Sequence, residues 1–201
     1  MLKKTHTAIG IASALAIMQP KSYTGILTTV VAGAIGAQLP DIDSTTSDSH
    51  RDADLICLSS VLFLCGAALC DQHWNMGLVN KIINNSSYVR ILLGVFGLIG
   101  LCAYGKETSH RTFMHSLLSA LGTTLAVWIA IPFAAPSFFI GYISHILIDL
   151  LNKRKVQILF PYKKGVCLNL CRSNGTVNSL LGSVGSALIV IEICILLSGK
   201  L

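Results

Sequence analysis

Residues 137–151 read SFFIGYISHILIDLL, an apolar run interrupted by one histidine and one aspartate that lie four residues apart. In an α-helix this spacing places His145 and Asp149 on the same face, about one turn apart. Imidazole and carboxylate groups are common metal ligands, and they are costly beside lipid unless something binds them. Alone, the pair is more simply explained as a buried hydrogen bond or a helix-to-helix contact, so its interpretation depends on the rest of the chain.

The rest of the chain has the composition of an integral membrane protein. Of its 201 residues 53% are hydrophobic and only 12% are charged, and the mean hydropathy is +0.69. Apolar stretches run at about 7–18, 23–39, 53–70, 88–104, 113–135, 137–151 and 177–198. A crossing needs roughly 17–25 such residues. We therefore predict an all-α, polytopic membrane protein with about five to seven membrane-embedded helices in one bundle, as a single domain over residues 1–201.

The seven stretches differ in how well they fit a full crossing. The third, fourth, fifth and seventh are convincing spans by length. The first, second and sixth are shorter, so each could be a tilted crossing, a re-entrant element or a half-buried helix.

Three further polar islands interrupt the apolar pattern. They are His6 in KTHTAIG, Asp41 and Asp43 in LPDIDS, and His110 and His115 in SHRTFMHSLL. If all seven segments cross in turn, these residues and the pair in residues 137–151 come to the same side of the membrane. The segment assignment does not use these residues, so their shared side is an independent indication of a common site.

The local sequence predicts how two of these islands present their side chains. Pro40 stops the preceding helix and is expected to leave an extended or turn segment, in which Asp41 and Asp43 can point the same way. A spacing of five does not place His110 and His115 on one helical face. We therefore expect His110 in the loop that enters the fifth helix and His115 within the first turns of that helix.

Arg111, beside His110, is the candidate for an anion clamp. Its rigid charged fork suits phosphate or carboxylate oxygens next to a metal. Its alternative role is interfacial snorkelling or a signal for membrane orientation. The remaining histidines and nearby acids are interpreted as solvated or structural: His50, His73, Asp48, Asp52 and Asp54.

Four imidazoles and three carboxylates exceed what one tetrahedral zinc ion requires. The set predicts a site for a divalent metal, with two ions or more, which could activate water and clamp the oxygens of a displacement at phosphorus. Zinc, manganese and iron all accept such a mixture of ligands, so the residues do not decide the metal.

Basic residues predict the orientation, because Lys and Arg are retained in short cytoplasmic loops. The face that carries the candidate ligands has eleven: Lys3, Lys4, Arg51, Lys106, Arg111, Lys153, Arg154, Lys155, Lys163, Lys164 and Arg172. The other face has four: Lys21, Lys81, Arg90 and Lys200. We therefore expect the site to face the cytoplasm. The same excess would attract anionic head groups, unless it is purely an orientation signal.

The islands LPDID, HR-x-x-x-HSLL and GY-x-SH-x-x-x-D-x-L occur here in a recognisable order. From His6 to about Pro161 the chain closely resembles the bacterial inner-membrane proteins described as LexA-regulated, membrane-bound metal-dependent hydrolases. The resemblance implies an inner-membrane location and metal-dependent hydrolysis. It also implies the site residues His6, Asp41, Asp43, His110, His115, His145 and Asp149, with Arg111 adjacent.

The sequence departs from the pattern of that family at three places. Thr5 stands where glycine often precedes the first histidine, and Ser44 stands where a further histidine often follows LPDID. The segment 175–179 lacks the glutamate that family members tend to carry there. If that glutamate contributes to the chemistry of the family, activity in this chain is altered or lost.

Three functions stay open at this point. The first is a membrane-bound hydrolase that cleaves a phosphoester, such as a phospholipid or a lipid-linked phosphate. The second is a divalent-cation transporter or a non-catalytic metal-binding membrane protein, and the third is a structural or regulatory membrane subunit. Residues on an ion pathway should spread through the membrane depth, whereas these gather near one face, which favours the enzyme. Membrane lipid is the expected partner, and nucleic acid is not.

Overall fold

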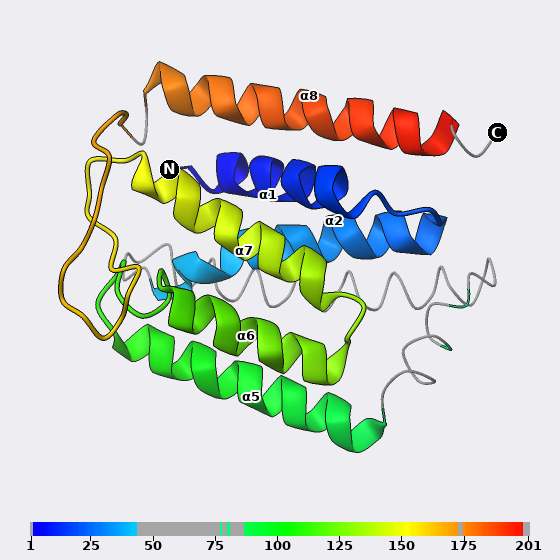
Figure 1. The fold of residues 1–201 in the computed structure, drawn as a ribbon, viewed down its shortest axis with the longest axis horizontal. Coiled ribbons are helices and arrows are strands. Elements are labelled where there is room, and N and C mark those ends of the chain that lie inside the picture. The colour runs from blue at the N-terminus through cyan, green and yellow to red at the C-terminus, as the bar shows by residue number, and fades with distance from the viewer. Residues whose placement is uncertain (1, 44–76, 78–79, 81–86, 173–174, 199–201) are drawn as a thin grey trace.

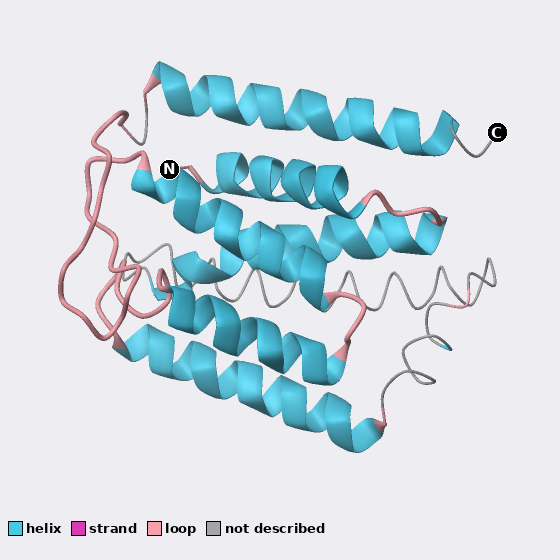
Figure 2. Ribbon diagram, viewed as in Figure 1, coloured by secondary structure: helices cyan, strands magenta, loops and turns pink. Residues whose placement is uncertain are grey.

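The computed structural model describes residues 2–43, 77, 80, 87–172 and 175–198, and within these ranges the regular structure is helical (Figure 2). The helices are α1 (Lys3–Met18), α2 (Tyr23–Gln38), α5 (Tyr88–Glu107), α6 (Leu117–Ala130), α7 (Ala135–Leu150) and α8 (Thr176–Ser198), with a short 3₁₀ helix η1 (Leu39–Asp43) after α2. The described part of the chain has no β-strand, only two isolated bridges. The prediction of an all-α fold is therefore confirmed for the described residues.

Fewer helices reach membrane-spanning length than predicted. Three helical stretches in the described ranges are long and apolar enough to cross a membrane: Tyr23–Asp43, Val89–Glu107 and Thr176–Ser198. This is below the predicted five to seven. The predicted third stretch, 53–70, lies outside the described residues. Helices α1, α6 and α7 have 16, 14 and 16 residues, or about 21–24 Å at 1.5 Å per residue, against a hydrocarbon core of about 30 Å.

Local sequence explains why the predicted span at 113–135 is wrong. Helix α6 begins only at Leu117, because the Ser116 hydroxyl accepts a hydrogen bond from the Ser119 amide and caps the helix there. It ends at Ala130, two residues before Pro132. Proline cannot donate to the helical ladder, and it biases the residue before it away from helix.

Small residues bring three helices close together. Helix α2 packs against both α1 and α7. A Cβ atom added at Gly141 of α7 would overlap the backbone carbonyl of Gly33 in α2, and one added at Gly36 would overlap the carbonyl of Phe138. Such contacts need residues without a side chain, as in helix pairs that pack closely in lipid.

The other helices complete the bundle. Helix α8 packs on α1, and α5 packs on α6, which in turn contacts α7. Helices α5 and α8 present large apolar side chains outward, including Phe96, Leu180 and Ile195. Such exposed surface suits a hydrocarbon environment.

One end of this bundle collects the polar segments. Figure 1 shows the start of α1, the ends of α2, α5 and α7 and the starts of α6 and α8 at the left of the view. The loop between α5 and α6 and the long loop between α7 and α8 lie at the same end. All the candidate site residues belong to these segments.

Candidate metal centre

The structure brings all seven predicted ligands together at this end of the bundle. The ligating atoms form three overlapping groups, each within 4.8 Å: His6, His145 and Asp149; Asp41, His115 and His145; and Asp43, His110 and His115. Each group could hold a metal ion. Because His145 and His115 are each shared by two groups, the three form one continuous cluster.

The central group has distances typical of metal ligands. The Nε2 atoms of His115 and His145 lie 3.3 Å apart. Asp41 Oδ1 lies 3.8 Å from the first and 3.6 Å from the second. In a tetrahedral zinc site with ordinary Zn–N and Zn–O distances, two ligand atoms lie about 3.3 Å from each other. The three atoms are therefore spaced nearly as a tetrahedral ion would require.

A backbone contact orients His145 for this role. Its Nδ1–H donates a hydrogen bond of 2.7 Å to the carbonyl of Ala37, near the end of α2. Since a carbonyl only accepts, this contact leaves the lone pair on Nε2, which faces His115 and Asp41. Bonds of this kind commonly fix the ring and tautomer of a ligating histidine.

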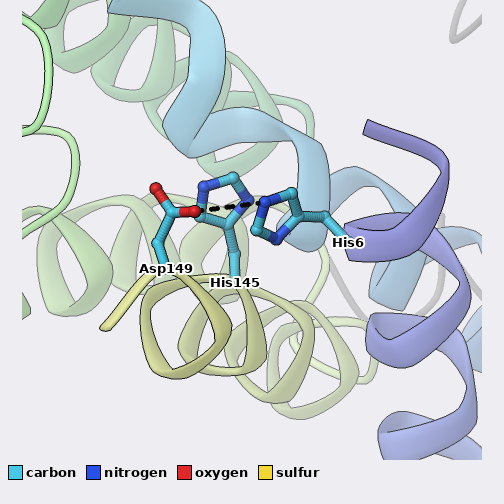
Figure 3. Close-up of side chains that lie close together, drawn as sticks. All are labelled: His6, His145 and Asp149. Carbon is cyan, nitrogen blue, oxygen red and sulfur yellow. Dashed lines mark ion pairs between the residues drawn. The ribbon is translucent and has the colours of Figure 1, made fainter. Parts of the chain in front are cut away.

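His6 joins the cluster from α1 (Figure 3). Its ring stacks on that of His145, with centroids 3.8 Å apart and planes 18° apart. Its Nε2 lies 3.4 Å from Asp149 Oδ1. The ring is 1% exposed, yet neither of its nitrogens makes a hydrogen bond. Buried polar atoms rarely lack a hydrogen-bond partner. The His6 ring is therefore the strongest indication in the structure that a metal ion binds here.

Asp43 connects the third group to the loop between α5 and α6. Its Oδ1 lies 2.7 Å from His110 Nδ1, and its Oδ2 accepts a 3.1 Å hydrogen bond from the Arg111 amide. The same Oδ2 lies 3.4 Å from His115 Nδ1. Asp43 can therefore serve as a ligand or as the carboxylate that orients His110 and His115.

Arg111 is tied into the site by its guanidinium group. Its NH2 lies 2.8 Å from Asp149 Oδ2, and its NH1 donates to the carbonyl of Arg154 at 3.0 Å. The side chain is buried, and its Nε has no hydrogen-bond partner. Its φ of 66° is the left-handed conformation, which non-glycine residues adopt mainly where surrounding contacts enforce it. Two of the nitrogens of the predicted anion clamp are thus already engaged within the protein.

Two local predictions were wrong. His115 lies before α6, in the turn that Ser116 closes, and not within the first turns of the helix. The LPDID segment, predicted to be extended or a turn with Asp41 and Asp43 pointing the same way, forms the tightly turning 3₁₀ helix η1. With about three residues per turn, Asp41 and Asp43 point in different directions. This is why they belong to different groups.

Sequence reasoning missed the residues that support the ligands. The Tyr142 hydroxyl donates to the Met114 carbonyl at 2.5 Å and pairs with Ser119 at 2.8 Å, which fixes the backbone beside His115. Tyr142 is fully buried and lies three residues before His145. Two features of the sequence could have indicated this role. The spacing of three places Tyr142 on the same helical face as His145, and a buried tyrosine hydroxyl is costly without a hydrogen-bond partner.

Residues 175–179, where the resemblance implies a glutamate, lie beside the start of α1. The Leu2 amide donates to Asn178 Oδ1 at 3.1 Å, and the Thr5 hydroxyl donates to the Asn178 carbonyl at 3.3 Å. Asn178 is buried and fastens α8 next to His6. The residues interpreted as solvated or structural, His50, His73, Asp48, Asp52 and Asp54, lie outside the described residues.

The donor set fits divalent cations. Nitrogen and oxygen ligands together suit zinc, manganese or iron. The cluster contains three carboxylates, those of Asp41, Asp43 and Asp149, and this concentration of negative charge favours binding a positive ion. Within the cluster, His110 and Asp41 have the more exposed side chains, at 29% and 17%. They mark the side from which water or a ligand could enter.

Comparison with known proteins gives a family but no activity. YvsG of Bacillus subtilis (strain 168) is 26% identical over 190 residues, covering 94% of this chain and 91% of that protein. No solved structure matches the chain. LexA regulation and metal-dependent hydrolysis stay predictions. The family described as YdjM inner membrane protein matches residues 1–198, in keeping with the three apolar helices of membrane-spanning length. The chain therefore belongs to the YdjM inner membrane protein family.

Proposed function

We propose that this protein is a metal-dependent hydrolase that cleaves a phosphoester, of a phospholipid or a lipid-linked phosphate, at the cytoplasmic face of the membrane. The observation that carries the proposal is the central group, in which His115, His145 and Asp41 are separated by 3.3–3.8 Å. Neither nitrogen of the buried His6 ring makes a hydrogen bond, which adds a second reason to expect a bound ion. Each shared histidine links two groups, which supports two ions or more.

The chain holds these ligands in position before any ion binds. The Ala37 carbonyl orients His145, Asp43 faces His115 Nδ1, and Arg111 holds Asp149. Such preorganisation is what a hydrolytic site needs. Bound divalent ions would supply Lewis acidity and lower the pKa of a coordinated water.

A phosphoester is the favoured substrate for two reasons. A site with several ions can stabilise both the attacking and the leaving oxygens of a displacement at phosphorus. Nε is the one nitrogen of the Arg111 side chain without a hydrogen-bond partner, and its N–H could still donate to a phosphoryl oxygen. A lipid substrate follows from the setting, because the cluster lies at one end of apolar helices.

Metal content is the first test. We expect protein purified without chelator to contain zinc or manganese by elemental analysis. His145→Ala and Asp41→Ala should lose most of it, and Thr29→Ala should keep it. Thr29 is also buried and polar, but it lines a cavity with Met18 and Pro20, away from the site. Equal metal content in all four proteins would contradict the proposal.

Turnover separates the enzyme from the transporter. Protein loaded with zinc or manganese should release a phosphorylated or dephosphorylated product from at least one member of a panel of phospholipids and polyprenyl phosphates. Metal flux into vesicles without turnover would instead support a divalent-cation transporter. The clustering of ligands at one end of the bundle supports the enzyme, because a transport path would need them at several depths.

A further inference from the structure

The loop between α7 and α8, residues 151–172, is strongly basic. It carries six exposed cationic side chains: Lys153, Arg154, Lys155, Lys163, Lys164 and Arg172. No acidic residue occurs between Asp149 and Glu192. These cations therefore have no acidic partner from within their own segment of the chain.

Backbone hydrogen bonds hold this basic loop against the site. The Leu168 and Leu170 amides donate to carbonyls at the end of α7, and Val156 and Val166 pair with each other at 2.9 Å. The Gln157 amide donates to the Arg111 carbonyl at 3.0 Å. The loop is thus fixed to the same turn that carries His110 and His115.

The basic loop also exposes apolar side chains. Leu159, Tyr162, Val166, Leu168 and Leu170 all point outward, and Tyr162 and Leu170 are 74% and 71% exposed. Single exposed apolar residues are ordinary, but five within twelve consecutive positions are an unusual concentration. Exposing these apolar side chains to water is unfavourable. At an anionic membrane surface, the apolar side chains would contact the acyl region and the cations would contact the head groups.

The position of the loop matches such a surface. It ends four residues before α8, which is long and apolar enough to cross the membrane. In Figure 1 it lies across the end of the bundle, beside the starts of α6 and α8. This is the level at which lipid head groups meet a spanning helix.

We infer that the basic loop is a binding surface for anionic phospholipid head groups, with its lysines and arginines on the phosphates and its exposed apolar side chains inserted at the acyl boundary. This surface is separate from the metal ligands and does not depend on hydrolysis. It would hold the end of the bundle that carries the site against the anionic leaflet.

Lipid retention tests the charge contribution. Full-length, metal-free protein in detergent micelles is given phosphatidylglycerol and phosphatidylcholine in competition, and retained lipids are counted by native mass spectrometry. Wild type should prefer phosphatidylglycerol. The double variant Lys163→Gln/Lys164→Gln should lose about thirtyfold of that preference, because each basic residue near the surface contributes roughly one kcal/mol of attraction. Salt at about 0.5 M should have a similar effect on wild type.

A matched control removes the same charge from the opposite end of the bundle. Lys21→Gln/Arg90→Gln changes a residue just before α2 and one near the start of α5. This variant should keep the wild-type preference. An equal loss in both double variants, or no loss in the loop variant, would overturn the inference and leave the loop as an orientation signal only.

Insertion of the apolar side chains has its own readout. A Tyr162→Trp protein is reconstituted in phosphatidylglycerol vesicles, and the wild-type spectrum is subtracted to remove the two native tryptophans. The difference emission should be blue-shifted and quenched by lipids brominated along the acyl chain. Emission typical of water, without quenching, would exclude insertion.

Discussion

Replacing His115 by alanine tests the metal centre at its most connected residue. His115 belongs to two of the three ligand groups, and its Nε2 lies within 3.8 Å of donor atoms from His145, Asp41 and Asp149. Loss of a residue that only orients a ligand typically costs 10–100-fold in metal affinity. Loss of a shared ligand should cost at least the upper value, about 100-fold or roughly 2.7 kcal/mol.

The assay is the increase in thermal stability when metal is added to protein freed of metal. At a concentration 100 times the wild-type Kd, one bound ion stabilises the fold by about 2.7 kcal/mol. A variant that binds 100-fold more weakly gains only about 0.4 kcal/mol at that concentration. Expression and membrane insertion should be unaffected, because His115 lies in the turn before α6 and in none of the helices long enough to cross a membrane.

The same measurement of metal-dependent thermal stability provides the control and the result that would refute the assignment. Thr29→Ala removes a buried polar group outside the site and should respond to metal like wild type. If His115→Ala gains as much stability from zinc or manganese as wild type does, the assignment of this cluster as a metal centre is wrong.

Three further predictions address the scaffold. Tyr142→Phe should lower the free energy of unfolding by about 1–3 kcal/mol, because the Met114 carbonyl loses its bond to the tyrosine hydroxyl, and it should weaken metal binding about tenfold in a calorimetric titration. Gly36→Ala should destabilise the protein by about 1–3 kcal/mol in thermal unfolding, since its Cβ would overlap the Phe138 carbonyl, whereas Gly100→Ala, with nothing within 4 Å, should be neutral or slightly stabilising. Reporter fusions should place the start of α1 in the cytoplasm and the end of α8 outside it; both ends in one compartment would contradict the assigned topology.

The sequence predicted the helical class and the common end of the candidate ligands, but not the lengths of the helices. Alternating apolar segments return the chain to one side after every second crossing, and this argument holds for short helices as well as long ones. Helix boundaries depend on local competition that hydropathy does not measure. Ser116 starts α6 two residues later than expected for a helix containing His115, because its side chain caps the amide of Ser119.

The details of the site depend on contacts between residues far apart in the sequence, which helical spacing cannot predict. The i, i+4 spacing placed His145 and Asp149 on one face, but the orientation of His145 comes from the carbonyl of Ala37, a residue 108 positions away. Likewise, the interpretation of Arg111 as a free anion clamp did not foresee its pairing with Asp149. Such pairings depend on how α2 and α7 meet, which is set by Gly33 and its neighbours.

The donors that meet at one end of the bundle are synthesised at different times. His6, Asp41 and Asp43 leave the ribosome about a hundred residues before His145 and Asp149. At roughly 5–20 residues per second, the α1–α2 hairpin waits roughly 5–20 s for its later partners. During that interval, moving its polar side chains into the hydrocarbon core would cost free energy. The newly made hairpin must therefore stay near the aqueous boundary, or be shielded by the insertion machinery, until α7 is translated.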